Sequence, residues 1–413
     1  MAELKILHVL PRWNHGGGAQ SILAEARHAR DHALAVTHQA LPLEPGGSLQ
    51  LLTQAVRARV RVHSAPDPER ERAVVEAADL LVVHYWNAPA LRAFVDRWRG
   101  RGLRWILYCR VNGLHEPQRL PLELARSACH TVLTSPHVAA IGRPGDVSVI
   151  PAIVPRPEPA AAADAERHGL LHVGTLNVFK LAADFIDLHV GLESRYGPVV
   201  VAGAGGDEAR YQERAERLGI AGHFSWAGFV PEPGALFRRA RILSYPVAPF
   251  TYASSDKVVQ EAQMHGLPVL LNRAAPISHL VEEGVTGMLA ADGREFTALL
   301  HSTLADARTL PSAAEIAAAA IRMHDPDVKI RRLLDIYKQV AAGPKRAVDD
   351  GFPDLAAWLE FQGARMARRQ RPSLDVMAAS PEALHAYQCW ACEGGLAQYQ
   401  NAHPSLRQMD AGH

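Results

Sequence analysis

Short apolar runs alternate along the chain with longer segments in which apolar positions recur at helical spacing. This alternation predicts parallel α/β structure, in which helices connect the strands. In the first half we expect strands at 6–10, 34–37, 80–83, 105–108 and 132–134, with helices at 19–29 and 90–98. In the second half we expect strands at 170–173, 199–202, 224–226, 242–245 and 269–271, and a helix at 327–340 that closes this half.

A Pro/Ala-rich stretch at 153–163 separates the two halves and is typical of an interdomain linker. We therefore predict domains at 1–155 and 165–341, followed by a helical extension at 342–413 that packs on the body. Helices are expected at 358–371 and from about 380 to 390. The first carries a basic cluster that we interpret as a solvated helix face: Arg365, Arg368, Arg369 and Arg371.

Composition narrows the class of protein. The 413 residues include 44 Lys and Arg against 43 Asp and Glu, so there is no basic excess to indicate a nucleic-acid partner. No segment reaches the roughly 18 apolar residues of a membrane span, and the first apolar run is too short for a signal peptide. We expect a cytoplasmic protein whose membrane contact is at most peripheral; its oligomeric state cannot be predicted from these features.

Cysteine and histidine spacing gives little support for metal or redox chemistry. The four cysteines are too few for a disulfide scaffold, and Cys389 and Cys392 have CxxC spacing without a partner pair, so we interpret them as helix-packing residues. The pairs His28/His32 and His168/His172 have HxxxH spacing but no evident third ligand. No metal and no cofactor are therefore expected.

Two glycine-rich loops follow predicted strands. His15-Gly-Gly-Gly-Ala-Gln20 opens a helix, where backbone amides can approach an anion. Val199-Val-Val-Ala-Gly-Ala-Gly-Gly206 begins like a dinucleotide fingerprint, but Glu208 stands at the third glycine position and no ribose-binding acid is evident. The second loop therefore argues against NAD or FAD.

The landmarks of both halves, taken in order, resemble the retaining glycosyltransferases of family 4. The resemblance covers roughly 4–341 and includes Lys5-Ile-Leu-His-Val-Leu-Pro with Gly16-Gly-Gly-Ala-Gln20, Leu80-Leu-Val-Val-His-Tyr-Trp, His172-Val-Gly-Thr-Leu-Asn-Val-Phe-Lys180, Phe224-Ser-Trp-Ala-Gly-Phe-Val230 and Glu261-Ala-Gln-Met-His-Gly-Leu-Pro-Val269. It implies the GT-B fold, with two Rossmann-like domains facing each other across a cleft. It also implies a nucleotide-sugar donor, with Lys180 on the diphosphate and Glu261 on the ribose.

The resemblance implies further roles by position. Donor-binding residues are expected to be Gly16, Gly17, Gly18, Gly174, Thr175, Lys180, Phe229, Val230, Ser254, Ser255, Lys257 and Glu261. Candidate catalytic residues are His84, Asn112 and Lys180, although His84 also fits a core role. Tyr85, Trp86 and Asn87 are candidates for the acceptor side.

Three positions depart from the family pattern. Thr175 replaces an arginine, Ala253 a glutamate that touches the donor sugar, and Asn112 a histidine near the reacting centre. Lys257 is our hypothesised substitute for the missing cation. On the first-domain side, Arg110 is a second candidate replacement cation close to Asn112, and His115 or Glu116 could reach the cleft from the same loop.

The resemblance thus implies a glycosyltransferase that transfers a sugar to an acceptor hydroxyl with retention and without a metal, by positioning the substrates and stabilising charge. The acceptor could be a glycan, a lipid-linked sugar or a small molecule. The alternative is a catalytically degenerate GT-B protein that acts as a sugar- or partner-binding scaffold, which the three departures favour. Phosphorylase-like chemistry on the same fold would need a pyridoxal lysine site that we cannot locate.

Overall fold

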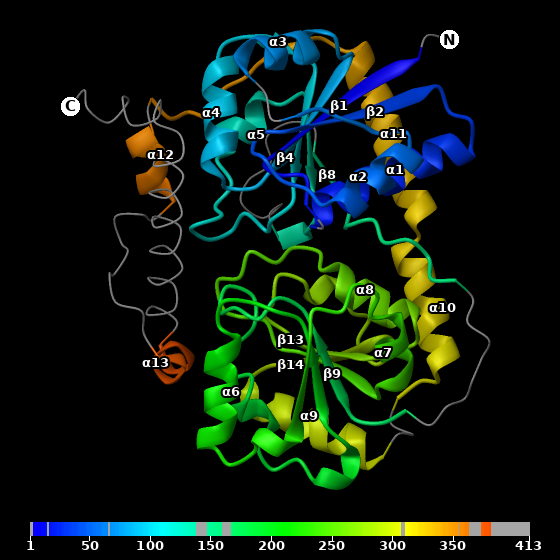
Figure 1. Cartoon of the computed structure of the whole chain (residues 1–413), viewed down its shortest axis with the longest axis vertical. Helices are drawn as coiled ribbons and strands as arrows, with labels where there is room; N and C mark the ends of the chain where they lie inside the picture. Colours follow the sequence, from blue (N-terminus) through cyan, green and yellow to red (C-terminus); the bar gives the residue numbers. More distant parts are fainter. Residues whose placement is uncertain are drawn as a thin grey trace. The chain divides into compact units, whose positions relative to one another are not determined.

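The computed structural model describes residues 3–14, 16–64, 67–137, 147–158, 167–306, 310–353, 355–362 and 373–380 (Figure 1). These residues form two compact units. Unit 1 contains the described residues up to 153 and those from 326 to 362, and unit 2 contains those from 154 to 325 and from 373 to 380. The predicted arginine cluster, the Cys389/Cys392 pair and the helix expected beyond 380 lie outside the described residues.

Unit 1 is built on a parallel sheet with the strand order β3-β2-β1-β4-β6-β7-β8. Its strands are β1 (Leu4–Leu10), β2 (Val36–Pro42), β3 (Arg61–Val62), β4 (Leu80–Tyr85), β6 (Trp105–Cys109), β7 (His130–Leu133) and β8 (Val147–Val149). The short strands β5 (Gly102–Leu103) and β15 (Arg346–Ala347) pair antiparallel beside it. Its helices are α1 (Gly17–Asp31), α2 (Leu49–Arg57), α3 (Pro68–Glu76), α4 (Pro89–Trp98), α5 (Leu122–Ser127), α11 (Pro326–Ala342) and α12 (Leu355–Phe361).

Helix α11 packs on the sheet of unit 1. Its apolar residues, among them Ile330, Leu333 and Tyr337, are buried in one cluster with Ile6 of β1 and Val82 of β4. The prediction that this helix closes the second half is therefore wrong. An amphipathic pattern specifies a buried face, but it does not say which sheet will cover that face.

Unit 2 holds a second parallel sheet with the strand order β11-β10-β9-β12-β13-β14. Its strands are β9 (Leu170–Val173), β10 (Val199–Ala202), β11 (Phe224–Gly228), β12 (Ile242–Tyr245), β13 (Val269–Asn272) and β14 (Gly287–Ala290). Its helices are α6 (Glu208–Arg217), α7 (Gly234–Arg239), α8 (Lys257–Met264), α9 (Gly293–Ala305), α10 (Ala313–His324) and α13 (Leu374–Ala379), with short 3₁₀ turns at η2 (Asp187–His189), η3 (Ser194–Tyr196), η4 (Ala221–His223) and η5 (Ser278–Leu280).

The glycine-rich loop after β10 has a packing role. A Cβ added to Gly203 would lie 1.8 Å from the carbonyl oxygen of Gly174, and one added to Gly205 would lie 2.2 Å from that of Leu176. Backbone hydrogen bonds tie the same segments together, since the amide of Gly174 donates to Ala202 and that of Leu176 donates to Ala204. These glycines are needed because two backbones meet here at van der Waals distance.

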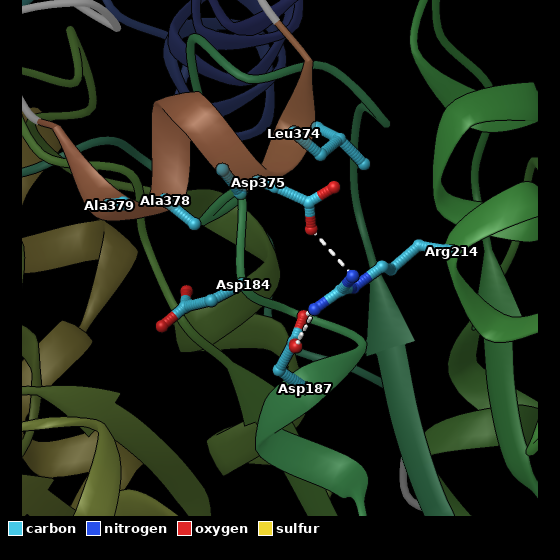
Figure 2. A pocket seen from close by; sticks show the side chains of 8 residues that line it. Asp184, Asp187, Arg214, Leu374, Asp375, Ala378 and Ala379 are labelled. Atoms are coloured by element: carbon cyan, nitrogen blue, oxygen red, sulfur yellow. Dashed lines mark hydrogen bonds and ion pairs between the residues drawn. The ribbon is translucent and has the colours of Figure 1, made fainter. Parts of the chain in front are cut away.

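Part of the C-terminal extension docks on unit 2. Helix α13 lies against α6, where Asp375 forms an ion pair with Arg214 at 2.5 Å (Figure 2). Asp375 forms a second ion pair with Arg217 at 3.0 Å. Arg214 also contacts Asp187. A pocket of about 360 Å³ lies between these segments; its lining residues are Ala183, Asp184, Asp187, Arg214, Leu374, Asp375, Ala378 and Ala379.

We expect Asp375→Asn to release α13 from α6 without unfolding unit 2. The substitution weakens two partly exposed ion pairs, which contribute about 0–1 kcal/mol each. Hydrogen exchange should accelerate at the amides of α13 and stay unchanged in β9 and β12. Glu193→Gln, which removes an exposed ion pair with Arg195 elsewhere in unit 2, serves as the control. Unchanged exchange in α13 would contradict an ionic attachment.

Within the described residues, no helix is long and apolar enough to cross a membrane.

Candidate functional site

The strand order of unit 2 reverses between β9 and β12. From β9 the chain proceeds to β10 on one side, and it later returns to place β12 on the other side. At such a switch point the loops that follow the two strands diverge and leave a crevice at the carboxyl edge of the sheet. The loop after β9 carries Gly174, Thr175 and Lys180, and the loop after β12 leads to the start of α8. Gly174, Thr175 and Lys180, together with Ser254 and Ser255 before α8, therefore lie in the two loops at this edge.

Lys180 is held between the two loops. Its Nζ lies 3.6 Å from Oδ2 of Asp256, and Oδ2 also accepts a hydrogen bond of 2.8 Å from the hydroxyl of Tyr245. The backbone adds a further connection, because the carbonyl of Lys180 accepts from the amide of Ala248 at 2.8 Å. The lysine thus stands at the switch point with a carboxylate beside it, a partner that sequence reasoning missed.

The surroundings of Lys180 keep it cationic. Burial lowers the pKa of its amino group, but the Asp256 carboxylate and the neighbouring Tyr245 and Tyr252 raise it more, and the net pKa lies above its ordinary value. The Lys180 side chain is still 19% exposed. A positive charge that keeps some solvent access is suited to an anionic ligand.

Helix α8 begins beside this lysine. Asp256 is its N-cap residue, but the Asp256 side chain makes no capping hydrogen bond to the helix. The two serines before it, Ser254 and Ser255, are both buried, and the Ser255 hydroxyl accepts from Gln260 at 3.2 Å. The Asp256 side chain is thus turned toward Lys180 and Tyr245 instead of capping the helix, and the amide end of α8 carries the positive end of the helix dipole at the switch point.

Glu261 lies just over one turn into α8 and is half-buried. Its carboxylate forms no hydrogen bond or ion pair with any residue that the structure describes. Burial raises the pKa of Glu261, and the nearby Lys257 lowers it in part. The helix ends three residues later, where Gly266 has a φ of +72° and a Cβ would lie 2.4 Å from the carbonyl oxygen of Ala313. A half-buried carboxylate without a protein partner is a candidate for ligand contact.

The remaining donor candidates of unit 2 lie at the ends of strands. Gly174 follows β9, and a Cβ there would be 3.4 Å from Nε2 of His172. Thr175 is exposed, and Phe229, directly after β11, is 70% exposed, whereas Val230 packs on the core. Ala253, which replaces the family's glutamate, is buried. No described contact links Phe229 to Lys180.

In unit 1 the sheet order reverses between β1 and β4, and Gly16–Gly18 follow β1. Gly16 is the N-cap of α1, and its amide donates to Oδ1 of Asn14 at 3.0 Å. Asn112 is buried, and its Oδ1 accepts from the amide of Leu114 at 2.9 Å, so its side chain is used inside the turn after β6.

Of the three acceptor-side candidates, Tyr85 and Asn87 form hydrogen bonds to a neighbouring loop, and Trp86 is partly exposed. The Tyr85 hydroxyl donates to the carbonyl of Arg119 at 2.6 Å, and the backbone amide of Asn87 donates to Oε1 of Gln118 at 2.8 Å. These two residues are buried and hold the 117–119 loop, whereas Trp86 is half-buried.

His84 belongs to a buried hydrogen-bonded chain. Arg110 Nε donates to His84 Nδ1 at 2.9 Å, and because arginine is always a donor, the proton of the neutral His84 ring must be on Nε2. Nε2 then donates to His8 Nδ1 at 3.0 Å, and His8 Nε2 donates to His38 Nδ1 at 2.9 Å. Burial, followed by the Arg110 charge, holds the pKa of His84 well below its ordinary value. Both ring nitrogens of His84 are engaged, which favours a core role over that of a base.

A further polar cluster, which no sequence motif indicates, consists of His8, His38 and Glu25, whose ligating atoms lie within 4.8 Å of one another. Two nitrogens bound to one tetrahedral zinc would lie about 3.4 Å apart. The ring nitrogens of His8 and His38 face each other at 2.9 Å, which is hydrogen-bond distance, and Glu25 accepts from the Tyr337 hydroxyl at 2.9 Å. The spacing of these side chains therefore fits a hydrogen-bonded cluster better than a zinc site. The HxxxH pair at His28 and His32 forms a stack instead, with ring centroids 4.1 Å apart.

Buried neutral histidines predict a loss of stability in acid. Burial lowers the pKa of His38, His172 and His189 to about 4, whereas the unfolded chain protonates near 6.5. Because the folded-state pKa values are depressed, their stabilising contribution is complete above about pH 6.5 and is lost as the pH falls toward 4. We expect urea midpoints to fall over this window by an amount equivalent to a few kcal/mol. A flat profile from pH 7.5 to 4.5 would contradict this expectation, and His301→Gln provides a control at a histidine that is not fully buried.

Two parallel Rossmann-like sheets, each with a switch point, define a GT-B fold. Solved structures share this fold, with 81% of the chain matching all of Anabaena Alr3699/HepE in complex with UDP and glucose (TM-score 0.65, 16% identity). A glycosyltransferase from Rickettsia africae matches 83% of the chain over 99% of its own length (TM-score 0.64, 14% identity). Sucrose-phosphate synthase from Thermosynechococcus elongatus matches 82% over 99% (TM-score 0.62, 14% identity).

The sequence comparisons find similarity to glycosyltransferases, which for the family model falls in unit 2. Residues 167–306 match the model of the family described as glycosyl transferases group 1. D-inositol 3-phosphate glycosyltransferase from Acidothermus cellulolyticus is 26% identical over 263 residues, which cover 60% of this chain. The chain spans about half the length of this curated relative, with 51% of it aligned.

Proposed function

We propose that this chain is a glycosyltransferase that moves a sugar from a nucleoside-diphosphate donor to an acceptor hydroxyl, with retention at the anomeric carbon. One observation carries the proposal. At the switch point of unit 2, Lys180 and the start of α8 provide positive charge, and the half-buried Glu261 carboxylate follows on the same helix. The match of 167–306 to the family described as glycosyl transferases group 1 supports sugar transfer as the activity of this segment.

The proposed roles follow from charge and geometry. Departure of the sugar leaves negative charge on the diphosphate, which Lys180 and the α8 amides would stabilise without a metal ion. Glu261 would accept hydrogen bonds from two vicinal ribose hydroxyls, which are charge-assisted and directional. Both roles rest on the neighbourhood of one helix start, and they agree with the UDP bound in the complex of HepE. No cofactor beyond the donor is needed.

A scaffold function is the second candidate, and two observations favour it. Ala253 is buried where the family pattern has a sugar-contacting glutamate, and Asn112 is used inside its own turn. A chain with these losses could bind a nucleotide without transferring a sugar. The two functions share nucleotide binding and differ in turnover.

A turnover assay tests the proposal. The full chain is incubated with UDP-, GDP-, ADP- and TDP-sugars and a mixture of sugar acceptors, with and without EDTA, and release of the nucleoside diphosphate is measured. We expect release that EDTA leaves unchanged, and NMR of the product should show the anomeric configuration of the donor. Binding without turnover for every donor would favour the scaffold. Inversion at the anomeric carbon would contradict the proposed stereochemistry.

A further inference from the structure

Helix α2 of unit 1 leaves large apolar side chains in solvent. Leu49 is 82% exposed, Val56 is 76% exposed and Leu52 is 40% exposed. Their spacing of i, i+3 and i+7 places them on one face of the helix. We refer to Leu49, Leu52 and Val56 as the α2 apolar face.

The rest of the helix explains how this face comes to be exposed. Leu51 and Ala55 are fully buried in the cluster beneath α1, so they anchor α2 to the unit. Ser48 caps the start of the helix by accepting from the amide of Leu51, and Arg30 donates to the carbonyl of Arg57 at the end at 2.9 Å. The helix is therefore fixed in place with its second apolar stripe turned outward.

Basic residues accompany the apolar face. Arg57 ends α2, Arg59 lies in the following turn, and Arg61 begins the edge strand β3; all three are exposed. None of them forms an ion pair with a residue that the structure describes. The chain contains no Asp or Glu between Glu44 and Asp67, and Glu44 is itself buried against Arg12.

We propose that the α2 apolar face, with Arg57, Arg59 and Arg61, docks on the surface of an anionic lipid bilayer. A short amphipathic helix with arginines beside its apolar stripe binds such a surface by inserting the stripe and attracting the head groups. A second copy of the chain is a poorer partner, because a two-fold contact through this face would bring the three arginines of each copy toward those of the other. This inference concerns unit 1 and does not depend on the proposed function.

Vesicle co-sedimentation of the full chain tests the proposal. We expect binding to phosphatidylcholine vesicles that contain about 30% phosphatidylglycerol, weaker binding to pure phosphatidylcholine, and loss of binding in high salt. Leu49→Ser with Val56→Ser should reduce binding at least about tenfold. Arg57→Gln, Arg59→Asn and Arg61→Gln together should reduce it about 100-fold, because each arginine near the surface contributes a factor of about five.

Val190→Ser with Val328→Ser is the matched control, since both valines are exposed but lie outside α2. The control should bind like the unaltered chain, and thermal melting should show that every variant is folded. Failure of the folded chain to sediment with anionic vesicles would overturn the proposal. Binding of the α2 variants as strong as that of the unaltered chain would also overturn it. A dimer in sedimentation velocity that Leu49→Ser with Val56→Ser dissociates would assign the face to a second copy instead.

Discussion

Lys180→Ala is expected to weaken binding of the nucleotide-diphosphate donor by at least about 100-fold, which corresponds to about 2.7 kcal/mol. Lys180 is cationic, partly exposed and placed at the switch point of unit 2, where a charge-assisted contact with phosphate would be made. Lys180→Arg keeps the charge and should retain most of the affinity. Calorimetric titration with the preferred donor measures both effects.

Asp256→Asn separates this role from a structural one. Asp256 pairs with Lys180 and accepts from Tyr245, so either substitution is expected to lower the melting temperature. The donor affinity should respond in opposite directions, because Asp256→Asn removes an anion from the proposed phosphate site, whereas Lys180→Ala removes a cation. If both variants melt early but bind the donor as the unaltered chain does, Lys180 serves only to neutralise Asp256.

Gly203→Ala is expected to destabilise unit 2 by about 3 kcal/mol or more. The added methyl group would lie 1.8 Å from the carbonyl oxygen of Gly174, so one of the two backbones must shift. Because Gly174 begins the loop that carries Lys180, the same shift should also weaken donor binding. Urea unfolding together with hydrogen exchange of the β10 amides measures the loss.

Gly206→Ala is the control for this substitution. A Cβ at Gly206 has no neighbour within 4 Å among the described residues, and the loop and the chemical change are the same. Its stability should stay within about 0.5 kcal/mol of the unaltered chain. Equal effects of the two substitutions would mean that the close approach of Gly203 and Gly174 is not a constraint on the fold.

The strands of unit 2 could be predicted well because they are short apolar runs bounded by turn residues. Those at 170–173, 199–202 and 242–245 occur in the structure with the predicted bounds. Strand β14 and helix α2 were missed, since β14 begins at a glycine, which is typical of a turn, and the period of α2 is interrupted by its outward apolar stripe. The helix at 326–342 was recognised, but its position against the first sheet depends on contacts over more than 200 residues of chain.

The site likewise contains residues that could be selected from the sequence and contacts that could not. Lys180 and Glu261 were selected from the resemblance, and the structure puts Lys180 in the loop after β9 and Glu261 on α8, the helix that follows β12. Their roles in donor binding stay predictions. The surroundings of Lys180 could not be predicted, because Tyr245 approaches it from the end of β12 and Asp256 from the start of α8. The chain from Arg110 through His84 and His8 to His38 crosses three strands, and no local spacing indicates it.

The central claim is that unit 2 binds a nucleoside-diphosphate sugar through Lys180 and Glu261. The most direct measurement is calorimetric titration of the folded chain with UDP-, GDP-, ADP- and TDP-sugars, repeated with Lys180→Ala and Glu261→Ala. We predict that at least one donor binds with a Kd of about 1 μM to 1 mM, that Lys180→Ala weakens this binding at least about 100-fold, and that Glu261→Ala weakens it at least about tenfold. The claim is contradicted if no donor binds to the folded chain, or if both variants bind the donor with the affinity of the unaltered chain.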